Sequence, residues 1–111
     1  MREISLLRQL VNYEQFVRLL DIVEDENSDT KKIHCIFEFC DKVLSNELNN
    51  RRGPLPIAHT KKIIRELLQA IDILHSKMIL HRDIKPDNIL IDSNGKLKLA
   101  DFGLAKKASF L

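Results

Sequence analysis

The chain has 111 residues, enough for one small domain, and a formal net charge of only +2. Its basic pairs are scattered along the sequence, so we expect a solvated surface and no nucleic-acid partner. No apolar run reaches 18 residues, and no signal peptide or lipidation signal is present, so we expect a soluble intracellular protein with no membrane partner. Cys35 and Cys40 lie on one apolar run, where they are typical of small hydrophobic residues in a reducing compartment.

The N-terminal part predicts a helix followed by two strands. Apolar residues between positions 2 and 11 recur at helical spacing, and the β-branched run from Phe16 to Val23 indicates a strand. The acidic stretch from Glu24 to Asp29 is expected to be a solvent-exposed loop. The run from Ile33 to Cys40 is more continuously apolar, which predicts a strand buried on both faces.

The C-terminal part predicts a long helix and a hairpin. Residues 41–50 are polar and indicate a short helix with a loop, and residues 52–56 contain the Gly and Pro that precede a helix. A helical stripe that we expect to pack in the core follows at Ile63, Ile64, Leu67, Leu68, Ile71 and Leu74. Two apolar runs, 89–91 and 97–100, flank the turn sequence Asp92-Ser93-Asn94-Gly95, which predicts a β-hairpin.

The strongest chemical signal lies on both sides of that hairpin. His81-Arg82-Asp83-Ile84-Lys85-Pro86-Asp87-Asn88 precedes it, and Asp101-Phe102-Gly103 follows it. This order of residues matches a phosphoryl-transfer motif, in which an Asp handles the proton of an attacking hydroxyl group. Asn88 and Asp101 offer hard oxygen donors suited to Mg²⁺, and Lys85 is a cation able to hold phosphate. The hairpin is expected to bring Asn88 and Asp101 side by side, whereas His81 is expected to have a packing role.

The order of these elements and motifs resembles the middle of a protein kinase, in particular a cyclin-dependent serine/threonine kinase. Arg2-Glu3-Ile4-Ser5-Leu6-Leu7 is similar to the end of the cyclin-binding helix of that family, and Asp101-Phe102-Gly103-Leu104-Ala105-Lys106 is similar to its metal loop. The resemblance implies an α+β, protein-kinase-like fold that is truncated. Residues 1–40 would be a small-lobe remnant and hinge, and residues 41–111 the first part of the large lobe.

Finer features resemble the branch that partners D-type cyclins in G1. They are Val11-Asn12-Tyr13-Glu14-Gln15, Gly53-Pro54-Leu55-Pro56, Asp72-Ile73-Leu74-His75-Ser76 and Ser109-Phe110. The transcription-regulating branch is the alternative, because Phe37-Glu38-Phe39-Cys40-Asp41 is similar to its hinge. Arg2 and Glu3 would lie on the helix that faces the cyclin.

The resemblance also implies roles for individual residues in a site for ATP and Mg²⁺. Asp83 would be the catalytic base, Lys85 a phosphate contact, and Asn88 and Asp101 the Mg²⁺ ligands. The adenine pocket would comprise the gatekeeper Phe37, the hinge residues Glu38, Phe39 and Cys40, and the floor residue Leu90. A hydrophobic spine joining the lobes would consist of Leu7, Leu19, His81 and Phe102.

Departures from the family pattern limit what these 111 residues are expected to do alone. They contain no Gly-rich phosphate loop, no strand Lys to pair with Glu3, and no activation-loop Thr or Ala-Pro-Glu, and Val43 stands where an Asp near the ribose is usual. We expect an ATP-dependent kinase of protein Ser/Thr in the nucleus and cytoplasm, recorded here as an incomplete segment that is marginally folded and inactive by itself. The alternatives are a non-catalytic cyclin-binding decoy and a decaying gene product without a stable fold.

Overall fold

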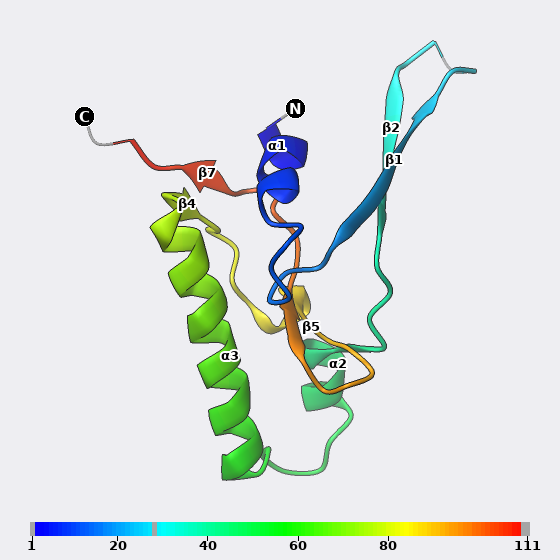
Figure 1. The fold of residues 1–111 in the computed structure, drawn as a ribbon. Coiled ribbons are helices and arrows are strands. Elements are labelled where there is room, and N and C mark those ends of the chain that lie inside the picture. The colour runs from blue at the N-terminus through cyan, green and yellow to red at the C-terminus, as the bar shows by residue number, and fades with distance from the viewer. Residues whose placement is uncertain (1, 28, 110–111) are drawn as a thin grey trace.

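The structure, a computed structural model, describes residues 2–27 and 29–109. The elements follow in this order: α1 (Arg2–Gln9), β1 (Leu19–Asp25), β2 (Lys32–Phe37), β3 (Lys42–Val43), α2 (Leu44–Asn49), α3 (Ile57–Ser76), β4 (Ile79–Leu80), the 3₁₀ turn η1 (Pro86–Asn88), β5 (Ile89–Ile91), β6 (Leu97–Leu99) and β7 (Lys106–Lys107). Figure 1 shows how they are arranged and labels most of them. The mixture of helices with small antiparallel sheets confirms the predicted α+β class.

Helix α1 ends two residues earlier than the apolar pattern predicts. The amide of Leu10 donates to the carbonyl of Leu7 at 3.1 Å, which is a tighter turn than the α-helical bond four residues back. Leu6, Leu7 and Leu10 are all buried, so the apolar face of this segment continues into the core past the helix end.

Strands β1 and β2 form an antiparallel ribbon whose bounds differ from the prediction. β1 begins at Leu19, because Phe16 instead makes a single parallel bridge to Leu99 of β6. It continues to Asp25, with Glu24 opposite Ile33, so the prediction of a loop from Glu24 onward is wrong at its first two residues. Cross-strand backbone pairing, which charge alone does not reveal, holds these acidic residues in the ribbon.

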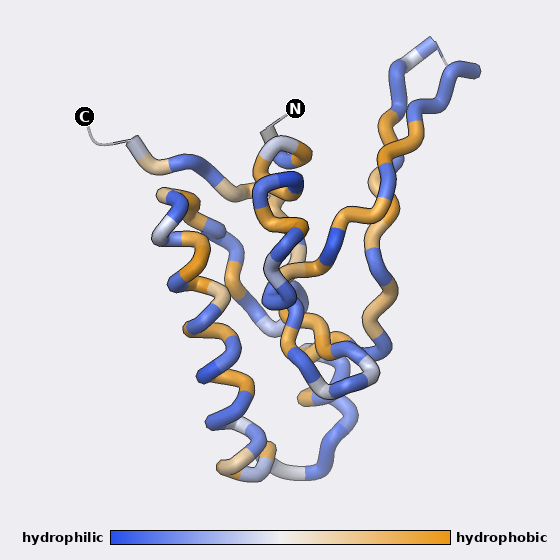
Figure 2. The backbone as a smooth tube through the Cα atoms, viewed as in Figure 1, coloured by the Kyte–Doolittle hydropathy of each residue, from blue (hydrophilic) through white to orange (hydrophobic). Residues whose placement is uncertain are grey.

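The prediction that the second strand is buried on both faces is wrong. β2 alternates between exposed and half-buried residues, and Ile36 and Phe37 are 44% and 38% exposed. Figure 1 shows the ribbon projecting from the rest of the chain, and Figure 2 shows hydrophobic residues along both of its strands. Within the described residues these two strands form a sheet of their own, too small to cover both faces of either strand.

Helix α3 confirms the long helix but only part of its predicted core face. Ile63, Ala70 and Leu74 are buried, whereas Ile64 and Leu68 are 48% and 59% exposed. The helix contacts β4 and β6 along one side, so the predicted stripe is wider than the surface it packs against. The expectation that Ile64 and Leu68 lie in the core is therefore wrong for the described residues.

The hairpin predicted between the two motifs is confirmed. β5 and β6 pair antiparallel with Ile89 opposite Leu99, and Gly95 in the connecting turn has φ of 78°, a left-handed conformation that favours glycine. The structure adds β3 on the other side of β5, with Val43 opposite Leu90. The short helix predicted within residues 41–50 is present as α2, but its leading strand β3 was not expected.

A second strand pairing that was not predicted joins β4 and β7. Leu80 of β4 lies opposite Lys106 of β7, and the amide of Ala108 donates to the carbonyl of Met78 at 2.7 Å. This pair ties the segment after the second motif to the end of α3. No helix in the described part of the chain is both long and apolar enough to cross a bilayer.

One core joins these elements. Its buried side chains come from α1, the segment before β1, α2, α3, the strands β4, β5 and β6, and the segment after the hairpin. They are Leu6, Leu7, Leu10, Phe16, Leu44, Ile63, Ala70, Leu74, Ile79, Ile89, Leu97, Leu99, Phe102 and Ala105. Because this core touches both motifs, packing fixes the positions of the polar residues described below.

An exposed ion pair between Glu14 and Lys96 connects the segment after α1 to the hairpin turn. The hydrogen bond from Lys96 lowers the pKa of the Glu14 carboxyl, and the same bond raises the pKa of the Lys96 ammonium. Because the pKa of Glu14 is lower in the folded chain, the ion pair stabilises the fold at pH values above the unfolded pKa of Glu14. This contribution is lost as pH falls through the folded pKa. The Lys96 contribution is present below its unfolded pKa and is lost as pH rises through the folded one.

We expect Lys96→Met to raise the pKa of Glu14 toward its ordinary value, because the donor and the positive charge are both removed. An NMR titration of the Glu14 carboxyl carbon measures this shift directly. Lys61→Met, which changes an exposed lysine on α3, is the matched control. A Glu14 titration midpoint that is the same in all three chains would contradict the pairing.

Candidate active site

The first motif forms a loop that ends in the turn η1. Lys85 is extended, and Pro86 begins the turn, where a residue without an amide hydrogen loses no bond. The amide of Asn88 donates to the carbonyl of Lys85 at 2.9 Å, which closes the loop. The loop therefore returns Asn88 toward Asp83 by local backbone geometry.

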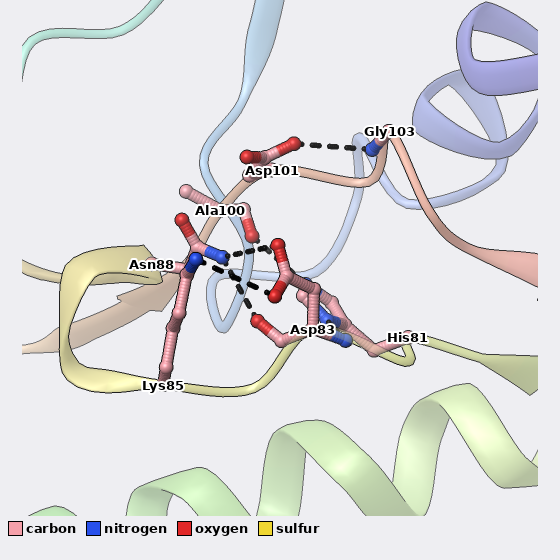
Figure 3. Close-up of polar contacts among 7 residues, drawn as sticks. All are labelled: His81, Asp83, Lys85, Asn88, Ala100, Asp101 and Gly103. Carbon is pink, nitrogen blue, oxygen red and sulfur yellow. Dashed lines mark hydrogen bonds and ion pairs between the residues drawn. The ribbon is translucent and has the colours of Figure 1, made fainter.

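Asn88 and Asp83 are bonded directly. Asn88 Nδ2 donates to the backbone carbonyl of Asp83 at 2.8 Å and to Asp83 Oδ2 at 3.1 Å, as Figure 3 shows. Asn88 is buried, so these two bonds satisfy its amide nitrogen and fix the rotamer of the Asp83 carboxylate. Lys85 Nζ lies 3.6 Å from Asp83 Oδ1, with half of the Lys85 side chain exposed. The Lys85 ammonium and the Asp83 carboxylate are therefore close together and both in part accessible to solvent.

The hairpin brings the second motif against this loop. The amide of Ala100 donates to the carbonyl of Asn88 at 2.9 Å, so Asp101 directly follows the residue that is bonded to Asn88. In Figure 3 the Asn88 side-chain oxygen turns away from Asp83, on the side where Asp101 lies. Asp101 has φ of 58°, and its Oδ1 accepts from the amide of Gly103 at 3.1 Å. A left-handed Asp is uncommon and is sustained here by the surrounding bonds.

His81, the first residue of the first motif, packs against the second motif. It is buried, its ring lies 4.9 Å from that of Phe102 in an edge-on arrangement, and its Nε2 is 2.8 Å from the carbonyl of Ala100. Its Nδ1 accepts from the amide of Asp83 at 3.1 Å. Since a carbonyl can only accept and an amide N–H only donate, the neutral tautomer with its proton on Nε2 satisfies both bonds. His81 therefore links the loop carrying Asp83 to the strand end carrying Asp101.

Of the four residues predicted to form a spine, two line one cavity and a third contacts one of them. Phe102 contacts His81, and Leu7 lines the same cavity as Phe102. Leu19 is half-buried against the core and borders a separate cavity with Arg8 and Val11.

A cavity of about 350 Å³ opens beside Asp101, within the range of small-molecule sites. Its lining includes predicted site residues from segments far apart in the sequence and the unpredicted Val17, and the full set is Glu3, Leu7, Val17, Phe37, Glu38, Leu90, Ala100, Asp101 and Phe102. Its walls are mostly apolar, with carboxylates at Glu3, Glu38 and Asp101. Such a lining suits a ligand that is largely apolar and carries a polar group able to bind a cation.

Two predicted pocket residues, Phe39 and Cys40, are not among the described residues that line this cavity. Phe39 is 86% exposed, and Cys40 is half-buried as a free thiol. Burial raises the pKa of the Cys40 thiol, and the nearby Glu38 charge adds to the rise. A raised thiol pKa leaves Cys40 protonated and weakly nucleophilic near neutral pH. Arg2 lies in α1, but its side chain falls outside the described residues, as does Phe110.

Two polar residues that sequence reasoning missed also hold this region. Lys98 of β6 is buried and lies 3.3 Å from Glu38 Oε1. Arg82 Nε donates to the carbonyl of Leu104 at 2.6 Å, and Arg82 itself has φ of 70°. A lysine inside the apolar run 97–100 was the available signal for the first. Nothing local indicates the second, because the bond spans 22 residues.

The donor set is compatible with Mg²⁺. Asn88 Oδ1 and the Asp101 carboxylate are hard oxygen donors on adjacent chain segments, and Mg²⁺ takes few protein ligands and completes its shell with phosphate and water. Among the described residues no group of three His, Cys, Asp or Glu side chains could hold a metal by itself.

Comparison with known proteins gives consistent matches. The family model described as "Protein kinase domain" matches residues 1–110. Cyclin-dependent kinase 4 of Mus musculus and that of Rattus norvegicus are each 42% identical over 113 residues, and so is that of Ovis aries. Each alignment covers 98% of this chain but 37% of the relative, so the chain spans little more than a third of the length of these relatives.

Proposed function

Since the chain belongs to the protein kinase family, we propose that it supplies the catalytic loop, the metal loop and part of the nucleotide cavity of a cyclin-dependent serine/threonine protein kinase. The observation that carries this proposal is the direct bonding of Asp83 and Asn88, with Asp101 placed beside them by the hairpin. Asp101 also lines the apolar cavity, so the polar groups of the two motifs adjoin a space for a nucleotide, as phosphate transfer requires.

Each polar residue has a distinct role in this proposal. Asp83, held by Asn88, accepts the proton of the attacking Ser or Thr hydroxyl. Lys85 offers its exposed ammonium to the transferred phosphate, and its 3.6 Å separation from Asp83 keeps both groups on one side of the loop. Asn88 and Asp101 hold Mg²⁺, which neutralises charge on the phosphates when it is bound.

The cavity receives the nucleotide base. Phe37 and Glu38 form the side of the cavity next to the linker, which is residues 38–41 between β2 and β3. Leu90 of β5 is also part of the lining, and Asp101 is at the proposed phosphate end. The backbone of residues 38–40 remains the proposed hydrogen-bonding edge for adenine. Exposure of Phe39 is compatible with this, because only main-chain groups of the linker are required.

The wider biology follows the relatives and is part of the proposal. A cyclin would bind the α1 side, since the relatives are named cyclin-dependent kinases, and a protein Ser/Thr would be the substrate. The D-type partner is the finer choice and rests on the sequence features that resemble the G1 branch. Residues 1–40 would then belong to the small lobe and hinge, and residues 41–111 to the large lobe. The corresponding cellular location of the kinase would be the nucleus and the cytoplasm.

Binding of a fluorescent ATP analogue, N-methylanthraniloyl-ATP, with and without Mg²⁺ tests the nucleotide assignment. Asp101→Asn removes the carboxylate but keeps a residue that tolerates the left-handed backbone at this position. We expect its affinity in Mg²⁺ to fall about tenfold, with little change in EDTA, because a charged metal ligand is lost. Asp72→Asn, an exposed change on α3, should bind like the unaltered chain. Equal affinity of Asp101→Asn and the unaltered chain in Mg²⁺ would refute the metal role.

A further inference from the structure

Lys98 is a buried charge that the proposed chemistry does not use. The buried polar or charged side chains of the described residues are His81, Asn88 and Lys98, and the first two belong to the loop already discussed. Lys98 is 9% exposed and lies on β6, three residues before Asp101. An ammonium at this depth is retained only where a negative group compensates it.

The compensating group is Glu38, at the start of the linker between the two parts of the chain. Lys98 Nζ lies 3.3 Å from Glu38 Oε1, and the same oxygen accepts from the amide of Arg18 at 2.9 Å. The amide of Glu38 in turn donates to the carbonyl of Arg18 at 2.9 Å. Glu38 is thus held through both its backbone and its side chain, and Lys98 supplies the only charge among those contacts.

The segment that contains Arg18 is itself bonded to β6. The amide of Leu99 donates to the carbonyl of Gln15 at 2.8 Å, and the amide of Val17 donates to the carbonyl of Leu99 at 3.0 Å. Lys98 and Leu99 therefore bind the same neighbouring segment, one through Glu38 and one through its backbone. The linker, residues 15–18 and β6 converge at this point.

These contacts connect opposite sides of the cavity. Phe37 at the end of β2 and Glu38 at the start of the linker line one side of it, and Ala100 and Asp101 line it just after β6. Lys98 is not among its lining residues. A change in the Lys98–Glu38 separation would move the linker relative to Asp101 without touching a ligand directly.

We propose that Lys98 is a positioning residue that fixes Glu38, and through it the linker side of the cavity, at the distance from Asp101 that a Mg²⁺–nucleotide requires. That the ligand is a nucleotide rests on the proposed function. That Lys98 holds the linker rests on the contacts alone. Removing the cation leaves the Glu38 carboxylate without its charge partner, so the carboxylate moves to solvent and the Arg18 amide loses its acceptor.

Amide hydrogen exchange of the 111-residue chain without nucleotide tests the linker role. The measured quantity is the exchange rate of the Arg18 amide divided by that of Ala70, a fully buried position in α3 that reports global opening. Lys98→Met should raise this ratio about tenfold, since a charge-assisted contact is lost, and Lys98→Arg should stay within about threefold of the unaltered chain. An unchanged ratio in Lys98→Met would overturn the proposal, because the substitution would then have no effect on the Arg18 amide beyond any change in global opening.

The charge itself is tested in a second background. Glu38→Gln removes the negative partner, so adding Lys98→Met to it should change the ratio by less than about threefold. An undiminished tenfold effect in that background would overturn the proposal. Should Lys98→Met unfold, Lys98→Gln keeps a polar head at the same site and gives the same comparison with Lys98→Arg.

Titration with N-methylanthraniloyl-ATP and Mg²⁺ separates the two claims. We expect Lys98→Met to bind about tenfold more weakly and Lys98→Arg to bind within about threefold of the unaltered chain. If the unaltered chain binds no analogue while the exchange ratios behave as expected, the proposed function fails and the linker role stands. If Lys98→Met binds as tightly as the unaltered chain, the positioning role is overturned.

Discussion

Asp83→Asn is expected to lower the rate of phosphate transfer about thousandfold, because general base assistance contributes roughly 10²–10⁴ to such reactions. The assay uses a kinase domain in which these residues are joined to a Gly-rich loop and a strand Lys, and it measures labelled phosphate transferred to a Ser/Thr peptide. The substitution preserves the shape of the side chain, so packing around Asn88 should be retained. We expect kcat to fall while KM for ATP changes little.

Asp87→Asn is the matched control for this experiment. Asp87 lies on the same loop, within η1, and is exposed. Its replacement makes the same change of charge four residues away and should leave kcat within about threefold, as surface changes usually do. A loss of activity equal in the two variants would show that loop charge, rather than proton transfer at Asp83, sets the rate.

Phe102→Ala is expected to destabilise the chain by about 3–5 kcal/mol, which is the usual cost of removing a buried aromatic ring. Phe102 is 2% exposed, and its ring contacts Phe16 at 5.8 Å and His81 at 4.9 Å between centroids. Small domains have a total stability of about 5–15 kcal/mol, so this loss would leave little or no cooperative unfolding transition. Urea denaturation followed by circular dichroism measures the effect.

Phe39→Ala provides the same chemical change at an exposed position. Phe39 is 86% exposed, so its truncation should alter the free energy of unfolding by less than about 0.5 kcal/mol. If Phe102→Ala also costs less than about 1 kcal/mol, then Phe102 does not hold the two motifs together as the structure indicates. The contrast between the two variants also tests which phenylalanines form the core.

The contacts of Phe102 explain why stability and the site are coupled in this chain. Phe102 follows Asp101 directly and packs on His81. His81 in turn accepts a hydrogen bond from the backbone amide of Asp83. Phe16, on its other side, comes from the segment that β6 holds by backbone bonds. The polar site therefore rests on a core assembled from both ends of the sequence, and a change in that core is expected to move Asp83 relative to Asp101.

Local sequence was sufficient for the motif, the hairpin and the existence of the long helix. Asp83 and Asn88 lie five residues apart, and a Pro-containing turn closes that interval, so their proximity is encoded locally. The turn ending in Asn94-Gly95 fixes the hairpin register that carries Asp101 back to Asn88. These features depend on residues close in sequence, whose conformational preferences can be read directly.

The tertiary structure decided what depends on distant segments. A continuous apolar run predicted a strand buried on both faces, yet burial depends on which layers cover it, and β2 is covered on neither face completely. Ile64 and Leu68 fit the helical stripe but face away from the sheet that α3 packs against. Short strands such as β4 and β7 carry no pattern of their own, since two residues are too few to show a period.

The same distinction separates the two halves of the site. By itself the sequence determined the chemical groups, namely Asp83, Asn88 and Asp101, because their order and spacing form a motif. Only the tertiary structure revealed that Lys98 pairs with Glu38 across 60 positions of the chain. A buried ion pair depends on the depth and the partner that the fold gives each residue, and neither is encoded in the immediate neighbours of a lysine or a glutamate.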